Sequence, residues 1–284
     1  FASYHDYVCY LGVEVDSGLQ VFWYEFINDY MPSSDIEKGF NQLQKAKKVN
    51  SPYLLNILSV WQYSAPARFF VITETTQAPS LFDYILLIGS SPLPHTLIKW
   101  FKLLCLAVKS LHSDQIAHGT INLRNIYIKT SAGSLKLRLP LTVLSNRAIS
   151  SPSINISQYT SPERLNGIIE PCIDIWSLGI CLLELLTQQA AYSECQNPQE
   201  LVSTICSFTL PQSIKLVQNK VASDLIRSCL SPANSRPNIN QILESPIFIE
   251  TPQTTQASAQ QSQDMNEQIQ IILPNDHENE NPSQ

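Results

Sequence analysis

A change in hydrophobic period near residue 80 constrains the fold more than any other feature of this sequence. Before it, β-branched and aromatic residues gather in short runs that predict strands, over residues 7–15, 19–26, 55–63 and 68–75. After it, apolar residues recur at the 3.6-residue spacing of a helix: Leu97, Trp100, Phe101, Leu104, Ala107, Val108 and Leu111. The sequence therefore predicts an α+β protein with a small β-rich lobe and a larger helical lobe.

The boundaries of these lobes follow from the same patterns. A helix over 34–48 is expected after the third strand, if the run 7–15 folds into a hairpin of its own. That arrangement places five strands and one helix in a first lobe of residues 1–76. The second lobe is expected over residues 77–250, with further helices over 172–187, 197–207, 219–230 and 238–244.

The last segment, residues 251–284, is dominated by Gln, Asn, Ser, Thr, Glu and Pro and holds no aromatic residue. This composition predicts a disordered tail, because too little apolar surface is available to offset the entropy lost on ordering. One apolar island, residues 269–274, is either a short docking motif or an incidental patch.

Composition argues against several classes of function. The net charge is −6, so the chain lacks the basic balance of a general nucleic-acid-binding protein. No run of about 18 apolar residues is present, and membrane insertion is not expected. The seven cysteines are scattered without a CxxC pair, which argues against a zinc site or a disulfide framework and favours the cytoplasm. No metal and no cofactor are expected.

Six short segments carry most of the remaining information. Four lie in the helical lobe, in this order: His118-Gly119-Thr120-Ile121-Asn122-Leu123-Arg124-Asn125, Ser161-Pro162-Glu163, Asp174-Ile175-Trp176-Ser177-Leu178-Gly179 and Ser231-Pro232-Ala233-Asn234-Ser235-Arg236-Pro237. Two lie in the strand-rich lobe: Val21-Phe22-Trp23-Tyr24-Glu25 and Phe70-Val71-Ile72-Thr73-Glu74.

In this order and at these separations, the segments resemble the motifs of the protein-kinase fold. Residues 118–125 stand at the place of the catalytic loop H-R-D-L-x-x-x-N, and residues 161–163 at the place of A-P-E. The resemblance covers about residues 1–250 and implies a bilobal kinase-like fold. The loop that begins His118-Gly119 and the strand at 21–25 most resemble the nuclear receptor-binding protein family, which is related to the with-no-lysine kinases.

The resemblance implies positions for the groups that hold a nucleotide, and this sequence fills them differently. The three glycine positions of the phosphate-covering loop fall on Ala2, Tyr4 and Tyr7, whose side chains would fill the space over the phosphates. The lysine position is Tyr24, whose phenol carries no positive charge, and the partner glutamate position is Gln42. No Lys or Arg occurs in the first three predicted strands.

The positions of the base and of the metal ligands are degenerate as well. Thr120 stands at the catalytic aspartate, and its hydroxyl is a weaker proton acceptor than a carboxylate. Leu139 stands at the metal-binding aspartate, or Arg138 if the register shifts by one residue, and a cation there is worse for Mg²⁺. Asn122 stands at another altered position of the loop. Asn125 remains, and its amide is expected to bond the loop backbone. No Asp or Glu occurs between positions 114 and 163, so a Mg²⁺ site is not expected.

Residues with structural roles are retained. Glu163 and Arg236 are expected to form a buried ion pair, and Asp174 to cap the backbone of the catalytic loop. This combination predicts a catalytically inactive pseudokinase, not an enzyme, whose fold serves as an adaptor or scaffold for other proteins. The family resemblance implies that such a scaffold acts in signalling or trafficking in the cytoplasm. Two alternatives stay open: a conformational switch that binds ATP without a metal, and an atypical active kinase. Binding of Mg-ATP is not expected.

Overall fold

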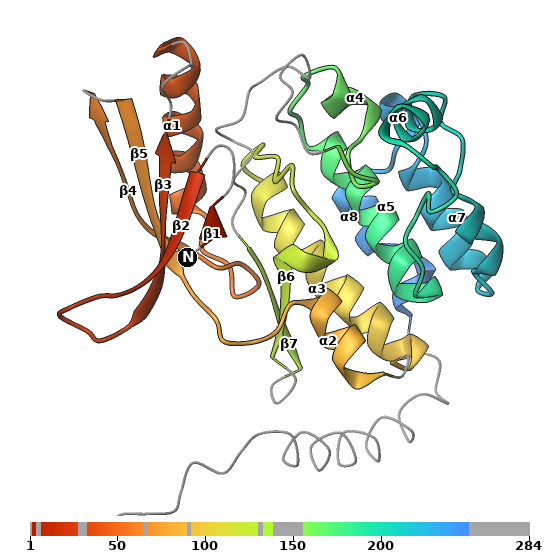
Figure 1. The fold of residues 1–284 in the computed structure, drawn as a ribbon. Helices are drawn as coiled ribbons and strands as arrows, with labels where there is room; N and C mark the ends of the chain where they lie inside the picture. The colour runs from red at the N-terminus through yellow and green to blue at the C-terminus, as the bar shows by residue number, and fades with distance from the viewer. Residues whose placement is uncertain are drawn as a thin grey trace, which may run out of the picture. The chain divides into compact units, whose positions relative to one another are not determined.

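The computed structural model describes residues 2–3, 7–27, 33–64, 67–89, 92–129, 133–138 and 156–249. Strands fill the first part of the chain and helices the second, so the predicted α+β fold with two lobes is confirmed (Figure 1). Residues Phe1–Phe248 form one compact unit. The predicted tail and its apolar island lie outside the described residues.

The first lobe is built on a five-stranded antiparallel sheet with the strand order β1-β2-β3-β5-β4. Its strands are β1 (Ala2–Ser3), β2 (Tyr7–Val13), β3 (Gln20–Ile27), β4 (Ile57–Ser64) and β5 (Ala67–Glu74). The helix α1 (Ser33–Lys48) follows the third strand. The run 7–15 is not the hairpin expected from the sequence, because all of β2 pairs with β3 and the additional strand is β1.

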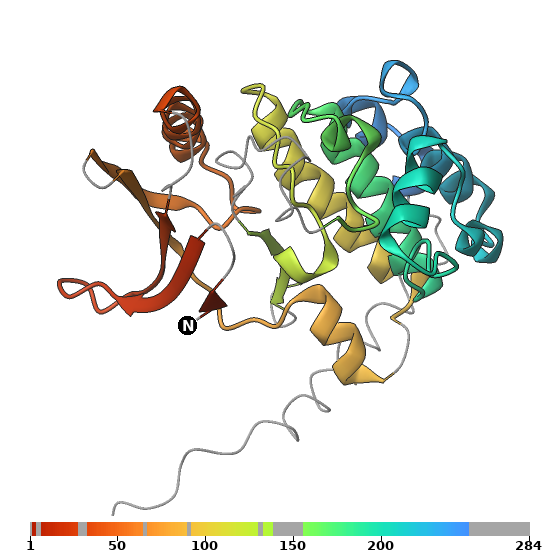
Figure 2. The ribbon, with the colours of Figure 1, turned by 45° about the horizontal axis from the view of Figure 1, so that its top comes forward.

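Side chains of the sheet alternate between two faces, as the pleat requires. Tyr24, Phe26 and Val71 point to the inner face and are buried in one cluster with Leu43 of α1. Trp23, one residue before Tyr24, is 38% exposed on the outer face. Figure 2 shows α1 beside the sheet and the helical lobe beyond the ends of the strands.

The second lobe is organised around two long helices. In α3 (Pro94–His112), all seven of the apolar residues that define its stripe are buried. The helix α5 (Cys172–Thr187) is buried over most of its length, because other helices surround it. The remaining α-helices are α2 (Leu81–Ile88), α4 (Pro162–Leu165), α6 (Pro198–Cys206), α7 (Lys220–Cys229) and α8 (Ile239–Leu243).

A two-stranded sheet, which the sequence analysis did not predict, joins the two lobes. Its strands are β6 (Ile126–Lys129) and β7 (Ser134–Leu137), which pair antiparallel. The backbone N–H of Leu137 donates to the carbonyl oxygen of Tyr53 at 2.7 Å, and the N–H of Leu55 donates to the oxygen of Leu137 at 2.9 Å. The end of β7 is therefore fixed between the lobes, and it positions the residue that follows, Arg138.

Among the described residues, no helix is both long enough and apolar enough to cross a lipid bilayer.

The packing of α5 against α7 depends on Gly179. A Cβ added to Gly179 would lie 2.7 Å from the Cβ of Cys229 and 3.3 Å from Cδ2 of Leu230. We expect Gly179→Ala to lower the free energy of unfolding by about 1–3 kcal/mol, because the helices must move apart. Gly12→Ala is the matched control, since its Cβ would lie at an ordinary 3.7 Å from Cγ2 of Val21. Equal urea midpoints for the two variants would contradict this prediction.

Candidate active site

One buried carboxylate fixes the beginning of the loop at residues 118–125. Asp174, in the first turn of α5, is fully buried. Its Oδ2 accepts the backbone N–H of His118 at 2.7 Å, and its Oδ1 accepts the N–H of Gly119 at 2.6 Å. Oδ2 also lies 2.8 Å from Nε2 of His112. Hydrogen bonds to a charged acceptor are strong, so α5 holds this turn of the chain firmly.

The asparagines of the loop bond its own backbone. Oδ1 of Asn122 accepts the N–H groups of Arg124 at 2.9 Å and Asn125 at 3.1 Å, which caps the short 3₁₀ helix Leu123–Asn125. The side-chain amides of Asn122 and Asn125 both donate to the carbonyl oxygen of Thr120, at 3.0 and 2.8 Å. Both side chains therefore stabilise the loop conformation.

His118 is the first residue of this loop and is fully buried. Its Nε2 is 2.6 Å from the carbonyl oxygen of Arg138, and its Nδ1 accepts the N–H of Thr120 at 3.2 Å. Burial lowers the pKa of His118, although the charge of Asp174 opposes this shift. A neutral ring in these contacts carries its proton on Nε2 and presents Nδ1 to the Thr120 hydroxyl, whose oxygen is 3.3 Å away.

Tyr24, at the predicted lysine position, meets a cation from the other lobe. The Nε of Arg138 donates to the Tyr24 hydroxyl at 2.9 Å, and the guanidinium carbon lies 5.4 Å from the centre of the Tyr24 ring. Burial raises the pKa of Tyr24, so its phenol stays protonated. Sequence reasoning did not predict the contact of Arg138 with Tyr24, because 114 positions separate the two residues. Gln42, at the predicted glutamate position, lies partly buried on α1.

Four predicted positions of this site carry no side-chain description. Tyr4 and Leu139 lie outside the described residues. For Tyr7, the structure describes only the backbone, which is part of β2. Ala2, at the first glycine position, pairs with Cys9 across β1 and β2.

The residues around the loop do not fit a magnesium ion. Across the described parts of the chain, no three His, Cys, Asp or Glu side chains gather where they could hold a metal. The sequence has no Asp or Glu between positions 114 and 163, and the guanidinium of Arg138 brings positive charge to the cleft. Mg²⁺ prefers anionic oxygen ligands, which the residues of this loop do not supply.

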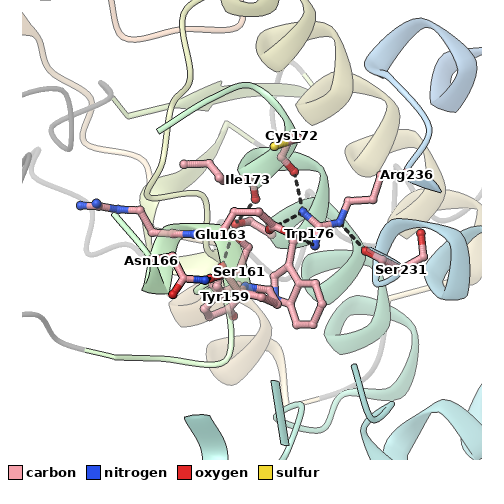
Figure 3. Close-up of polar contacts among 12 residues, drawn as sticks. Tyr159, Ser161, Glu163, Asn166, Cys172, Ile173, Trp176, Ser231 and Arg236 are labelled. Atoms are coloured by element: carbon pink, nitrogen blue, oxygen red, sulfur yellow. Dashed lines mark hydrogen bonds and ion pairs between the residues drawn. The ribbon is translucent and has the colours of Figure 1, made fainter. Parts of the chain in front are cut away.

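Below the loop, Arg236 and Glu163 form a two-pronged ion pair (Figure 3). Nη1 and Nη2 of Arg236 donate to the two carboxylate oxygens of Glu163 at 2.8 and 3.1 Å. Arg236 also donates to the backbone oxygens of Ser231 at 2.7 Å and Cys172 at 3.1 Å, and its guanidinium lies 5.3 Å from the ring of Trp176. The side chain of Arg236 is only 1% exposed. The pair therefore connects α4, α5 and the segment after α7.

A second buried carboxylate, Glu184 of α5, was not identified from the sequence. It accepts hydrogen bonds from the Tyr159 hydroxyl, from Nε2 of Gln158 at 3.0 Å and from the N–H of Ala191 at 2.9 Å. Burial raises the pKa of Tyr159, so this phenol remains a donor. Glu184 therefore anchors the segment just before α4 to the core helix.

Comparison with protein families gives a match over nearly the whole described unit. Residues 8–248 match the sequence profile of the protein kinase domain. The chain is 25% identical over 247 residues to the serine/threonine-protein kinase Wnk of Drosophila melanogaster. The alignment covers 85% of this chain and 10% of that protein. It is 23% identical to the serine/threonine-protein kinase WNK4 of Rattus norvegicus, in an alignment that covers 85% of this chain and 20% of WNK4. It is 25% identical to WNK8 of Arabidopsis thaliana, in an alignment that covers 83% of this chain and 42% of WNK8. The chain thus spans less than half the length of these relatives.

Solved structures agree with the fold. The structure of Rad53 residues 1–466 in complex with AMP-PNP superposes with a TM-score of 0.70 and 18% identity, covering 86% of this chain and 62% of that one. The autoinhibited serine kinase domain of titin gives a TM-score of 0.66 and 16% identity, covering 88% and 78%. At these identities the likeness supports the architecture alone.

These comparisons overturn one prediction. The degenerate loop led us to expect a chain that is not an enzyme, but its relatives are named serine/threonine-protein kinases and its profile is that of the protein kinase domain. The comparisons point to a phosphotransferase. The prediction was based on a few altered positions of the sequence, whereas the match to the protein kinase domain extends over residues 8–248.

The Glu163–Arg236 pair gives a prediction for stability. We expect Arg236→Met to lower the free energy of unfolding by about 3–5 kcal/mol, because it leaves the carboxylate of Glu163 without its buried cation. Arg124→Met is the matched control, since the side chain of Arg124 is 65% exposed and its contacts with Asp83 and the Phe82 ring should contribute no more than about 1 kcal/mol. Guanidinium unfolding measures both, and equal stabilities would show that the pair contributes little.

Proposed function

The chain belongs to the protein kinase domain family, and on that premise we propose that it acts as an adaptor or scaffold that binds other proteins in the cytoplasm. The observation that carries this proposal is an aromatic face on the outer side of the first sheet. The resemblance to nuclear receptor-binding proteins supports it, because that resemblance implies scaffolds of signalling or trafficking. The cytoplasmic assignment is supported by the seven cysteines, all within the described residues, which are free thiols.

The aromatic face consists of Tyr10, Trp23, Trp61, Tyr63 and Phe70. Tyr10 pairs with Trp23 across β2 and β3, and Trp61 pairs with Phe70 across β4 and β5. Trp61 stacks on Phe70 with ring centres 5.3 Å apart, and Trp23 meets both rings edge to face at 5.6 and 5.9 Å. The five side chains thus form a continuous surface across four strands.

This surface remains open to solvent. Trp23 is 38% exposed and Tyr63 is 61% exposed, while the opposite face of the same strands is buried. Aromatic side chains are enriched at protein interfaces, because they bury a large area and lose few rotatable bonds. The net charge of −6 argues against a nucleic-acid ligand for the surface. Its chemistry suits the apolar surface of another protein.

Removing the exposed rings tests the proposed adaptor role. We expect the double variant Trp23→Thr, Tyr63→Thr to recover its bound proteins about tenfold less well in quantitative affinity purification, a loss of about 1.4 kcal/mol. Threonine preserves strand propensity, so the sheet should persist. Leu86→Gln, Leu87→Gln on α2 is the matched control, because it removes two side chains that are 65% and 74% exposed elsewhere. An unchanged set of bound proteins in the sheet variant would refute the proposed face.

A second candidate function is phosphotransfer to serine or threonine, which the names of the relatives support. In that case the base would be His118, reached through Thr120, because Oγ1 of Thr120 lies 3.3 Å from Nδ1 of His118. The substrate hydroxyl would pass its proton to the Thr120 oxygen as the Thr120 proton moves to Nδ1. The low pKa that burial gives His118 makes this a weak base.

A radiolabelled phosphotransfer assay distinguishes this candidate. If the relay operates, Thr120→Val should lose at least about 100-fold in rate, because no hydroxyl remains, whereas Thr120→Ser should retain most of it. Thermal unfolding of each variant controls for folding. Incorporation by the wild type no greater than that of a reaction without the protein would exclude the candidate, and equal rates for Thr120→Val and the wild type would exclude the relay.

A further inference from the structure

The backbone of Arg138 is fixed to the helical lobe. Its N–H donates to the carbonyl oxygen of Asn125 at 2.8 Å, and its carbonyl oxygen lies 2.6 Å from Nε2 of His118. Both partners belong to the loop that Asp174 holds against α5. The direction in which the Arg138 side chain leaves the backbone is therefore set by the core of the second lobe.

The side chain of Arg138 ends in the other lobe. Its Nε donates to the hydroxyl of Tyr24 on β3 at 2.9 Å, and its Nη2 lies 3.6 Å from Sγ of Cys9 on β2. The guanidinium carbon is also 5.5 Å from the centre of the Phe22 ring and 5.4 Å from that of Tyr24. One side chain thus joins the loop of the helical lobe to two strands of the sheet.

The surroundings make this contact strong. Tyr24 is fully buried, and Cys9 is buried beside it. Burial raises the pKa of both the Tyr24 phenol and the Cys9 thiol, so both remain neutral hydrogen-bond partners of a permanently charged guanidinium. Bonds from a charged donor and contacts with aromatic rings gain strength away from water. By contrast, the ion pair of Lys136 with Glu74, which also joins the lobes, is partly exposed and screened by solvent.

The contact of Arg138 with Tyr24 lies at the position where a kinase would hold the phosphates of a nucleotide. Tyr24 occupies the lysine position on β3, and in the phosphoryl-transfer fold the cation at that position faces the phosphates of a nucleotide between the lobes. We propose that Arg138 is a clamp between the lobes that takes the place of a bound nucleotide, so that the two lobes keep one arrangement without a ligand. This inference does not depend on the proposed adaptor role, although a fixed arrangement would suit a binding surface.

Hydrogen exchange on the full chain tests the clamp, with Tyr24→Phe as the main variant. This change keeps the ring and removes the hydroxyl that accepts from Arg138, so the sheet should fold normally. We expect exchange to become at least about tenfold faster in residues 118–125, in the opposite lobe, as well as in β2 and β3. Arg138→Met should give the same pattern and lower the Tm by about 3 °C or more. Arg124→Met, which alters an exposed cation of the same loop, should change neither.

Two results would overturn the proposal. One is an effect of Tyr24→Phe confined to β3, which would make the hydrogen bond a local feature of the sheet. The other is a rise in the wild-type Tm with millimolar ATP, measured with Mg²⁺ and with EDTA, because Arg138 would then leave room for a nucleotide. We expect no rise in either buffer. Loss of partner binding in the sheet variant is a separate measurement, so failure of the clamp and failure of the adaptor role can be told apart.

Discussion

The arrangement of the cleft depends on the buried carboxylate of Asp174. A carboxylate this deep in the protein is tolerated only because backbone N–H groups and an imidazole surround it. Those contacts fix the turn at His118 and Gly119, and His118 in turn bonds the carbonyl group of Arg138. A chain of hydrogen bonds thus runs from the core of the helical lobe to the sheet, through residues far apart in sequence.

The region where these hydrogen bonds reach the sheet, around Arg138 and Tyr24, has an unusual electrostatic character. Phosphoryl transfer ordinarily needs a cation for the phosphates and carboxylates for the metal. Here the position predicted for the lysine is Tyr24, a buried phenol, and the guanidinium of Arg138 reaches it from the opposite lobe. The match to the protein kinase domain nevertheless extends over residues 8–248, so the fold follows that family although this part of the site departs from its motifs. The ion pair of Arg236 and the contacts of Glu184 are features of the scaffold.

The outer face of the first sheet is the surface on which the proposed adaptor role rests. Strands that pack a core on one side normally present polar residues on the other. In this chain the outer side carries interlocking aromatic rings, among them Trp61 and Phe70. Such a surface costs solubility unless another molecule covers it, which is why we connect it with protein binding. Its position on the sheet is independent of the chemistry of the cleft.

The sequence by itself determined the α+β architecture, the order of the lobes and most helix bounds, because hydrophobic period is a local property. The span 172–187 predicted for the central helix is the one observed for α5. Only the tertiary structure decided where the first strand lies, that β6 and β7 form a small sheet, and that Arg138 reaches Tyr24. The contact of Arg138 with Tyr24 spans 114 positions, a separation that local patterns do not encode. The aromatic face depends on both. The alternation of side chains along each strand is a local property of the sequence, whereas the alignment of the four strands is decided by the tertiary structure.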